Sequence, residues 1–247
     1  MALYNYLASH PQVLRPSRRE IEFFSHYYVR GLDWYRAHFP LRVTSALLAH
    51  LGKGRKVISG ESSPFYLPHP KAAERIATTV PGVRLIVLLR EPVARAYSHY
   101  MHELRNGHEN LSFEEAVATE DQRVAGEMGH MQADLGYHSI RYCRHAYVRL
   151  GEYIDQLKPY LKLFSRDQIL AVRSEDLFIQ PQNTLDQVTD FLGLGRCAIT
   201  GFKKMNSQAY APLSASNPQL VRKLEDHYRP YNTALYDELG VDFHWWS

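Results

Sequence analysis

The clearest element of the chain is the apolar run Val-Arg-Leu-Ile-Val-Leu-Leu at residues 83–89, whose β-branched members are typical of a buried strand of a parallel sheet. Pro92 follows this run and suits the first turn of a helix. Apolar side chains then recur at helical spacing up to Leu104, and Asn106-Gly107 ends the pattern. The sequence therefore predicts a strand, a tight turn and a helix in succession, an order of elements that is typical of α/β folds.

The same pattern recurs later in the chain. Residues 168–172 form a second short apolar strand, a turn follows at 174–176, and a helix is predicted over 181–192 with Gly193 as its cap. A third strand candidate, 56–58, runs into the polar segment that begins at Gly60. Further amphipathic helices are predicted over 112–119, 139–161 and 218–239, and Pro230 is expected to kink or split the last of them.

Strands separated by helices predict a parallel sheet with helices on both faces. Ligands of such sheets bind beyond the carboxyl ends of the strands. This rule places Arg90 and the turn at Glu61 at the expected site. Because the chain shows no internal repeat and no long linker, we expect residues 1–247 to form one domain.

The composition argues against two classes of protein, those that track nucleic acids and those that span membranes. The 29 Lys and Arg against 26 Asp and Glu give a net charge of only +3, so a nucleic-acid-tracking surface is not expected. The longest unbroken apolar run, 85–89, is far below the roughly 18 residues of a membrane helix, and the first residues do not resemble a secretory signal. A soluble, cytoplasmic protein without a transmembrane segment is the resulting prediction.

Metal and thiol chemistry are not indicated by residue spacing. The two cysteines lie far apart, and the 13 histidines offer only pairs, such as His99 with His102 or His138 with His145, without an evident third ligand. We therefore expect no metal site. Hydrolase, kinase and dehydrogenase motifs are also missing from the sequence.

Arg90 and Ser98 are the first candidates for ligand binding. An arginine that leaves a strand, and a serine about two helical turns along the next helix, can face one crevice where backbone N–H groups also point at an anion. A phosphate group is the expected ligand. The alternative is that Arg90 is an ordinary surface ion-pair partner.

Residues 88–100, which read LLREPVARAYSHY, closely resemble the 3′-phosphate-binding segment of sulfotransferases that use 3′-phosphoadenosine 5′-phosphosulfate (PAPS), in particular the carbohydrate (heparan sulfate) branch and its bacterial relatives. Other segments match in the family's order: 19–24, 31–35, 61–66, 175–177, 191–194, 210–213, 228–232 and 242–245. The resemblance thus covers nearly the whole chain.

The resemblance implies a P-loop-like three-layer α/β fold and transfer of a sulfuryl group from PAPS to an acceptor hydroxyl or amine. Glu20 would be the general base, with a pKa raised by burial beside aromatic side chains such as Phe23 and Phe24. Arg90 and Ser98 would hold the 3′-phosphate of the donor. No metal is implied.

A loop near the C-terminus would complete the cationic part of the site. The candidates are Lys203 and Lys204, because in relatives this loop closes over the cofactor. The acceptor class, with carbohydrates among the possibilities, and the oligomeric state stay open.

Several positions depart from the family pattern. Relatives open with a buried strand and a phosphate-binding loop, and Met1 falls where that loop ends, so we expect the first strand and the 5′-phosphosulfate loop to be absent from this chain. Glu22, Ser25 and Ser62 stand where relatives carry histidine, aspartate and lysine. The alternative to an active sulfotransferase is a non-catalytic remnant that binds a nucleotide or polyanion through its 3′-phosphate half-site.

Overall fold

Two pairs of parallel strands lie at the centre of the fold. In the computed structural model, β3 (Leu85–Leu89) pairs with β4 (Ile169–Arg173) in the register Leu85 to Ile169 through Leu89 to Arg173. A shorter pair joins β1 (Val13–Leu14) to β2 (Ile58–Ser59). The structure describes residues 2–41, 56–198, 213 and 217–246.

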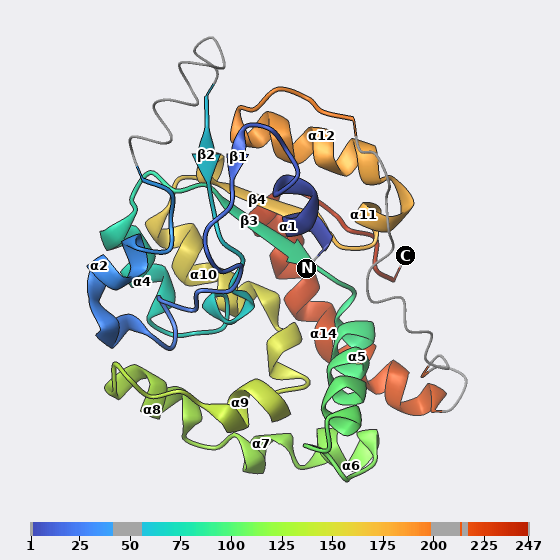
Figure 1. Cartoon of the computed structure of the whole chain (residues 1–247). Helices are drawn as coiled ribbons and strands as arrows, with labels where there is room; N and C mark the ends of the chain where they lie inside the picture. Colours follow the sequence, from blue (N-terminus) through green and yellow to red (C-terminus); the bar gives the residue numbers. More distant parts are fainter. Residues whose placement is uncertain (1, 42–55, 199–212, 214–216, 247) are drawn as a thin grey trace.

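Helices cover both faces of the β3–β4 pair (Figure 1). Side chains of a strand alternate between faces, so Ile86 and Leu88 pack with the cluster that contains residues of α12, whereas Val87 and Leu89 pack with α10 and α14. This arrangement confirms the predicted three-layer α/β architecture with a short parallel sheet.

The other elements are helices and short 3₁₀ turns. In chain order they are α1 (Ala2–Leu7), η1 (Tyr28–Arg30), α2 (Gly31–Arg36), η2 (Pro64–Tyr66), α4 (Ala72–Thr79), α5 (Pro92–Arg105), α6 (Phe113–Ala118), α7 (Glu120–Arg123), α8 (Glu127–Ala133), α9 (Ile140–His145), η3 (Arg149–Gly151), α10 (Tyr153–Leu163), η4 (Arg166–Gln168), α11 (Asp176–Ile179), α12 (Pro181–Leu192) and α14 (Pro218–Leu239).

Local sequence signals placed several helices correctly. α5 begins at the predicted Pro92, and α12 ends at Gly193, which takes the left-handed conformation (φ 67°) of a helix C-cap. α6 begins after Ser112, whose side chain forms a capping box with Glu115.

The prediction of one continuous helix over 139–161 is wrong, because this stretch is divided into α9, η3 and the first part of α10. The carboxylate of Glu120 accepts hydrogen bonds from the N–H groups of Val148 (2.6 Å) and Arg149 (2.9 Å), which a continuous helix would use internally. Gly151 then lies against the ring of Tyr228, so closely that an added Cβ would come within 2.8 Å of it. Contacts distant in sequence therefore interrupt the helix.

Of the two outcomes expected at Pro230, a kink or a split, the split is not observed, since α14 runs from Pro218 to Leu239 as one helix. Buried side chains on both sides of the proline, among them Leu224 and Leu235, hold the helix in place. Tertiary packing thus outweighs the missing proline N–H.

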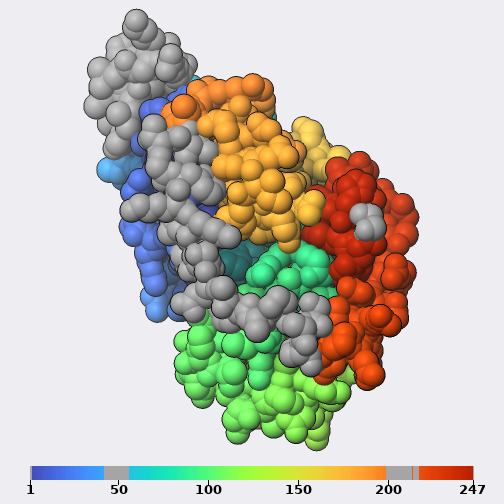
Figure 2. Space-filling view, turned by 90° about the vertical axis from the view of Figure 1, so that its right-hand side faces the viewer, coloured from blue at the N-terminus to red at the C-terminus, as the bar shows by residue number. Residues whose placement is uncertain are grey.

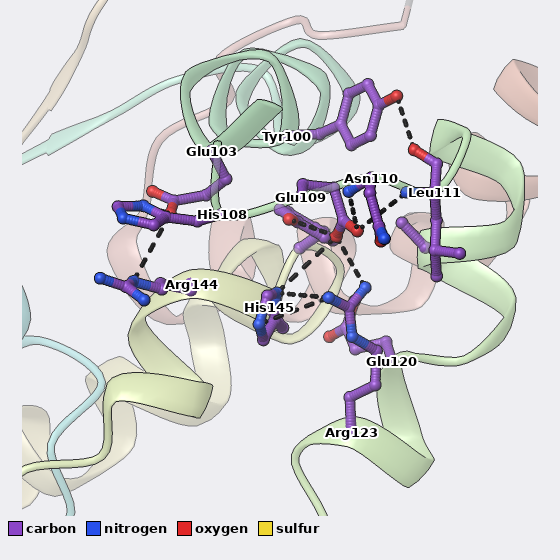
Figure 3. A network of polar contacts seen from close by, with 12 residues as sticks. Tyr100, Glu103, His108, Glu109, Asn110, Leu111, Glu120, Arg123, Arg144 and His145 are labelled. Atoms are coloured by element: carbon purple, nitrogen blue, oxygen red, sulfur yellow. Dashed lines mark hydrogen bonds and ion pairs between the residues drawn. The ribbon is translucent and has the colours of Figure 1, made fainter. Parts of the chain in front are cut away.

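Helices α5 to α9 form the lower part of the molecule, below α11 and α12 (Figures 1 and 2). A polar network around Glu109 fixes this part (Figure 3). Its carboxylate accepts hydrogen bonds from Arg123 Nη1 (2.6 Å) and from the Tyr147 hydroxyl (2.9 Å), and Arg123 also contacts His145 Nδ1 at 2.7 Å. Burial alone would raise the pKa of Glu109, but these donors bring it to about 2.

Among the helices of the described residues, none has both the length and the apolar character needed to cross a bilayer. The cytoplasmic location stays a prediction.

Candidate functional site

The carboxylate of Glu61 fixes the backbone that follows Glu20, the general base expected from the resemblance. The Glu61 carboxylate accepts hydrogen bonds from the backbone N–H of Ile21 (3.2 Å), from the Ser63 hydroxyl (2.6 Å) and from the Tyr66 hydroxyl (2.8 Å). Tyr66 Oη in turn accepts a hydrogen bond from the N–H of Phe23 (2.8 Å). The carboxylate of Glu61 therefore joins the loop after β2 to the segment 21–23. Burial raises the pKa of Glu61 above its ordinary value.

Glu20 is not buried beside Phe23 and Phe24, which corrects the sequence-based expectation. The two phenylalanines are buried in the core, whereas 44% of the Glu20 side chain is exposed. Its carboxylate pairs with Arg19 Nη2 at 2.6 Å. The backbone directs Ile21 into the core and so leaves the preceding side chain at the surface.

Glu22, not Glu20, is the carboxyl group of this segment that lies in a protected environment. It has a left-handed backbone (φ 53°), which is uncommon outside glycine and often marks functional segments. The Ser25 hydroxyl donates a hydrogen bond of 2.6 Å to its carboxylate. Burial, supported by the nearby charges of Glu61 and Glu20, raises the pKa of Glu22 to about 7.

Arg90 follows the last residue of β3 and is exposed, and Ser98 lies half-buried on α5. Among the described residues, no carboxylate forms an ion pair with Arg90. An exposed guanidinium and a hydroxyl are suitable donors for a phosphate group. Both residue types are therefore compatible with the 3′-phosphate that the resemblance implies.

The N-terminus of α5 is not open to an anion, contrary to the expectation that backbone N–H groups would point at the phosphate. The carboxylate of Glu91 accepts hydrogen bonds from the N–H groups of Val93 (2.7 Å) and Ala94 (2.6 Å). The first turn of the helix is thus capped by its own chain. Phosphate binding by the side chains of Arg90 and Ser98 stays a prediction.

α10 holds the loops after β2 and β3 through two tyrosines on one face. The hydroxyl of Tyr153 donates to the carbonyl of Arg90 (2.8 Å), and that of Tyr160 donates to the carbonyl of Tyr66 (2.6 Å). The two tyrosines are seven positions apart, which is about 10 Å along the helix axis. One rigid helix therefore positions both the loop after β3, which carries Arg90, and the loop that holds the segment 21–23.

Lys203 and Lys204 lie outside the described residues. The sequence analysis placed the turn at Glu61 at the expected site but gave no role to the Glu61 carboxylate or to Tyr66, both in the segment 61–66. Their role in fixing the segment 21–23 is evident only from hydrogen bonds to residues about 40 positions earlier. No local sequence pattern predicts such distant contacts.

The comparisons with known proteins identify the family. The family model described as the sulfotransferase domain matches residues 2–219. This chain belongs to the sulfotransferase family. The resemblance stated from the sequence is thereby confirmed.

Two curated relatives of this sulfotransferase align with nearly its whole length. The heparan sulfate glucosamine 3-O-sulfotransferase 3B1 of Mus musculus is 31% identical, with 99% of this chain and 61% of the relative covered. The membrane-associated sulfotransferase kil1 of Dictyostelium discoideum is 27% identical, with 97% and 62% covered. The chain thus spans about six tenths of the length of these relatives.

A solved structure shares the fold. The crystal structure of a sulfotransferase from Alicyclobacillus acidocaldarius superposes with a TM-score of 0.69 at 27% identity, covering 99% of this chain and 92% of that one. This match supports the P-loop-like assignment of the α/β fold.

Proposed function

We propose that this sulfotransferase moves the sulfuryl group of PAPS to a hydroxyl or amine of an acceptor. The acceptor oxygen or nitrogen forms a bond to sulfur, the bond between sulfur and the 5′-phosphate oxygen breaks, and adenosine 3′,5′-bisphosphate leaves. The observation that carries the proposal is Arg90, an exposed guanidinium that directly follows β3 and has no carboxylate partner among the described residues. Ser98 lies on α5, the helix that begins two residues after Arg90. Catalysis of such transfers depends mainly on positioning and on charge neutralisation.

Arg90 and Ser98 would set the register of the donor by holding its 3′-phosphate. Lys203 and Lys204 are the proposed cationic contacts from the C-terminal loop. These two lysines would add positive charge beside the phosphate groups of the donor, since lysine binds phosphate as a point charge.

Glu20 is the proposed general base. Its exposed carboxylate is accessible to an acceptor and lies beside the Arg19 guanidinium. The proton lost by the acceptor would pass to this carboxylate as the new bond forms. Glu22, whose carboxylate is engaged by Ser25, would support the segment.

Carbohydrate hydroxyls are the first acceptors to test. The relatives include heparan sulfate glucosamine 3-O-sulfotransferases, which by name act on a sugar. Amines and other hydroxyl compounds are the comparison classes in the same screen.

The experiment is transfer of labelled sulfate from PAPS to an acceptor panel by the wild-type chain and by Glu20→Gln. We expect the variant to lose about 10²- to 10⁴-fold in rate, the usual contribution of a general base, and to bind adenosine 3′,5′-bisphosphate within about twofold of wild type. Glu74→Gln, which changes an exposed carboxylate of α4, is the matched control and should keep the rate. Transfer by Glu20→Gln at the wild-type rate would remove Glu20 from this role.

The alternative is a binding module that retains the 3′-phosphate half-site without catalysis. It predicts that the wild-type chain binds the bisphosphate through Arg90 but labels no acceptor in the panel. The same screen therefore separates the two functions.

A further inference from the structure

His26, His138 and Cys143 lie together although they come from separate parts of the chain. The ligand atoms that they offer all lie within 4.8 Å of one another. Cys143 Sγ and His138 Nε2 are 3.7 Å apart, and the two imidazole rings are stacked with centroids 3.5 Å apart. In a tetrahedral zinc site with one sulfur and several nitrogen ligands, neighbouring ligand atoms are separated by about 3.3–3.7 Å.

The imidazole of His26 has a nitrogen without a partner. Within the described part of the chain, its Nε2 is buried and accepts or donates no hydrogen bond. A buried polar atom normally has a partner, and one without a partner requires an explanation such as an ion. Here that atom belongs to a group of three side chains that are all good ligands of a borderline-soft cation.

We propose that His26, His138 and Cys143 bind a zinc ion. Zinc accepts imidazole nitrogen and thiolate sulfur together, and it tolerates distorted geometry because its filled d shell imposes none. His138 is exposed, so a fourth position can be taken by water. This proposal is independent of the sulfotransferase chemistry.

The loop that carries His138 is held in place by a neighbouring carboxylate. Glu127 accepts hydrogen bonds from the hydroxyls of Tyr137 (2.7 Å) and Ser139 (2.6 Å), the residues on either side of His138. Ser139 also caps α9, since its Oγ accepts from the N–H of Tyr142 (3.0 Å), and α9 carries Cys143. Fixed neighbours of this kind reduce the entropy lost when a ligand atom is ordered on an ion.

The ion would connect two parts of the fold. His26 follows the segment that contains Glu22, and its N–H donates to the Glu22 carbonyl at 2.9 Å. His138 and Cys143 belong to the region of α8 and α9. Zinc would therefore hold the segment of the proposed base against the helices of the lower part.

This inference departs from the expectation of no metal site. Sequence spacing paired His138 with His145, but His145 contacts Arg123 instead. His26 lies more than 100 positions before its two partners, so only the fold brings the three together.

The test is a titration of the demetallated full chain with Co²⁺ as a spectroscopic probe, followed by displacement with Zn²⁺. We expect one ion per chain, a thiolate-to-cobalt charge-transfer band, its loss when Zn²⁺ is added, and a higher melting temperature of the zinc-loaded chain. His138→Gln changes an exposed side chain and should weaken zinc binding by more than about tenfold, since even partners outside the ligand set cost 10- to 100-fold. Cys143→Ser should abolish the charge-transfer band.

Cys197→Ser is the matched control, because Cys197 is an exposed free thiol outside the group. It should leave stoichiometry, band and affinity unchanged. Zinc affinity of His138→Gln within twofold of wild type, or a charge-transfer band that persists in Cys143→Ser, would overturn the proposal. Circular dichroism of each variant verifies that the fold is retained.

Discussion

The hydroxyl of Ser25 donates a 2.6 Å hydrogen bond to the carboxylate of Glu22. This bond favours the ionised carboxylate, yet the pKa of Glu22 lies at about 7, because burial outweighs it and the charges of Glu61 and Glu20 act in the same direction as burial. The folded protein therefore binds a proton at Glu22 more tightly than the unfolded chain does. The pKa of Glu22 thus falls in the range typical of histidine.

Glu22→Gln should change how stability depends on pH. A carboxyl group with a raised pKa in the folded state favours folding below the unfolded pKa of about 4.5, and this contribution is lost as the pH rises towards 7. The variant lacks this titration and retains an acceptor for Ser25. Between pH 5 and pH 8 we expect the free energy of unfolding of Glu22→Gln to rise above that of wild type, by on the order of 1–3 kcal/mol.

Denaturant unfolding of both proteins at several pH values measures this difference. Glu74→Gln is the control, because a change at this exposed side chain of α4 should stay within about 0.5 kcal/mol at every pH. A difference between wild type and Glu22→Gln that does not vary with pH would show that Glu22 is not the titrating group.

Gly151→Ala should destabilise the protein by about 1–3 kcal/mol through overpacking. The new Cβ would lie 2.8 Å from the ring of Tyr228, which is fully buried and donates a hydrogen bond to the Val148 carbonyl. Gly129→Ala is the matched control, since Gly129 lies in α8 with no atom near its added Cβ. It should be neutral or stabilising by up to about 1 kcal/mol.

Urea unfolding at pH 7 checks this pair of variants. Equal stabilities of the two alanine variants would mean that Tyr228 moves aside without cost, and that the close contact does not explain the break between η3 and α10.

The sequence was sufficient where a local signal determined the structure. The apolar run of β3, Pro92 at the start of α5 and Gly193 at the end of α12 each carry their own conformational preference. The family, and with it the sulfotransferase fold, followed from ordered motifs over nearly the whole chain.

Long-range contacts explain what the sequence did not predict. The helix break at Val148 depends on Glu120, and the burial of Glu22 rather than Glu20 depends on the hydrogen bonds to Ser63 and Tyr66. Each of these contacts joins residues 28 to 43 positions apart, so no window of local sequence contains both partners.

The 3′-phosphate site is the central claim of the functional proposal, and Arg90→Ala tests it. Each lost charge-assisted hydrogen bond costs on the order of 1.5–3 kcal/mol, or about 10- to 150-fold in affinity. Arg222→Ala, which removes an exposed arginine of α14, is the matched control.

The most direct measurement is calorimetric binding of adenosine 3′,5′-bisphosphate and of adenosine 5′-monophosphate to wild type and to both variants. We predict that wild type and Arg222→Ala prefer the bisphosphate by at least about tenfold, and that Arg90→Ala loses this preference while its affinity for the monophosphate stays within twofold. An undiminished preference in Arg90→Ala would contradict the assignment of Arg90 to the 3′-phosphate.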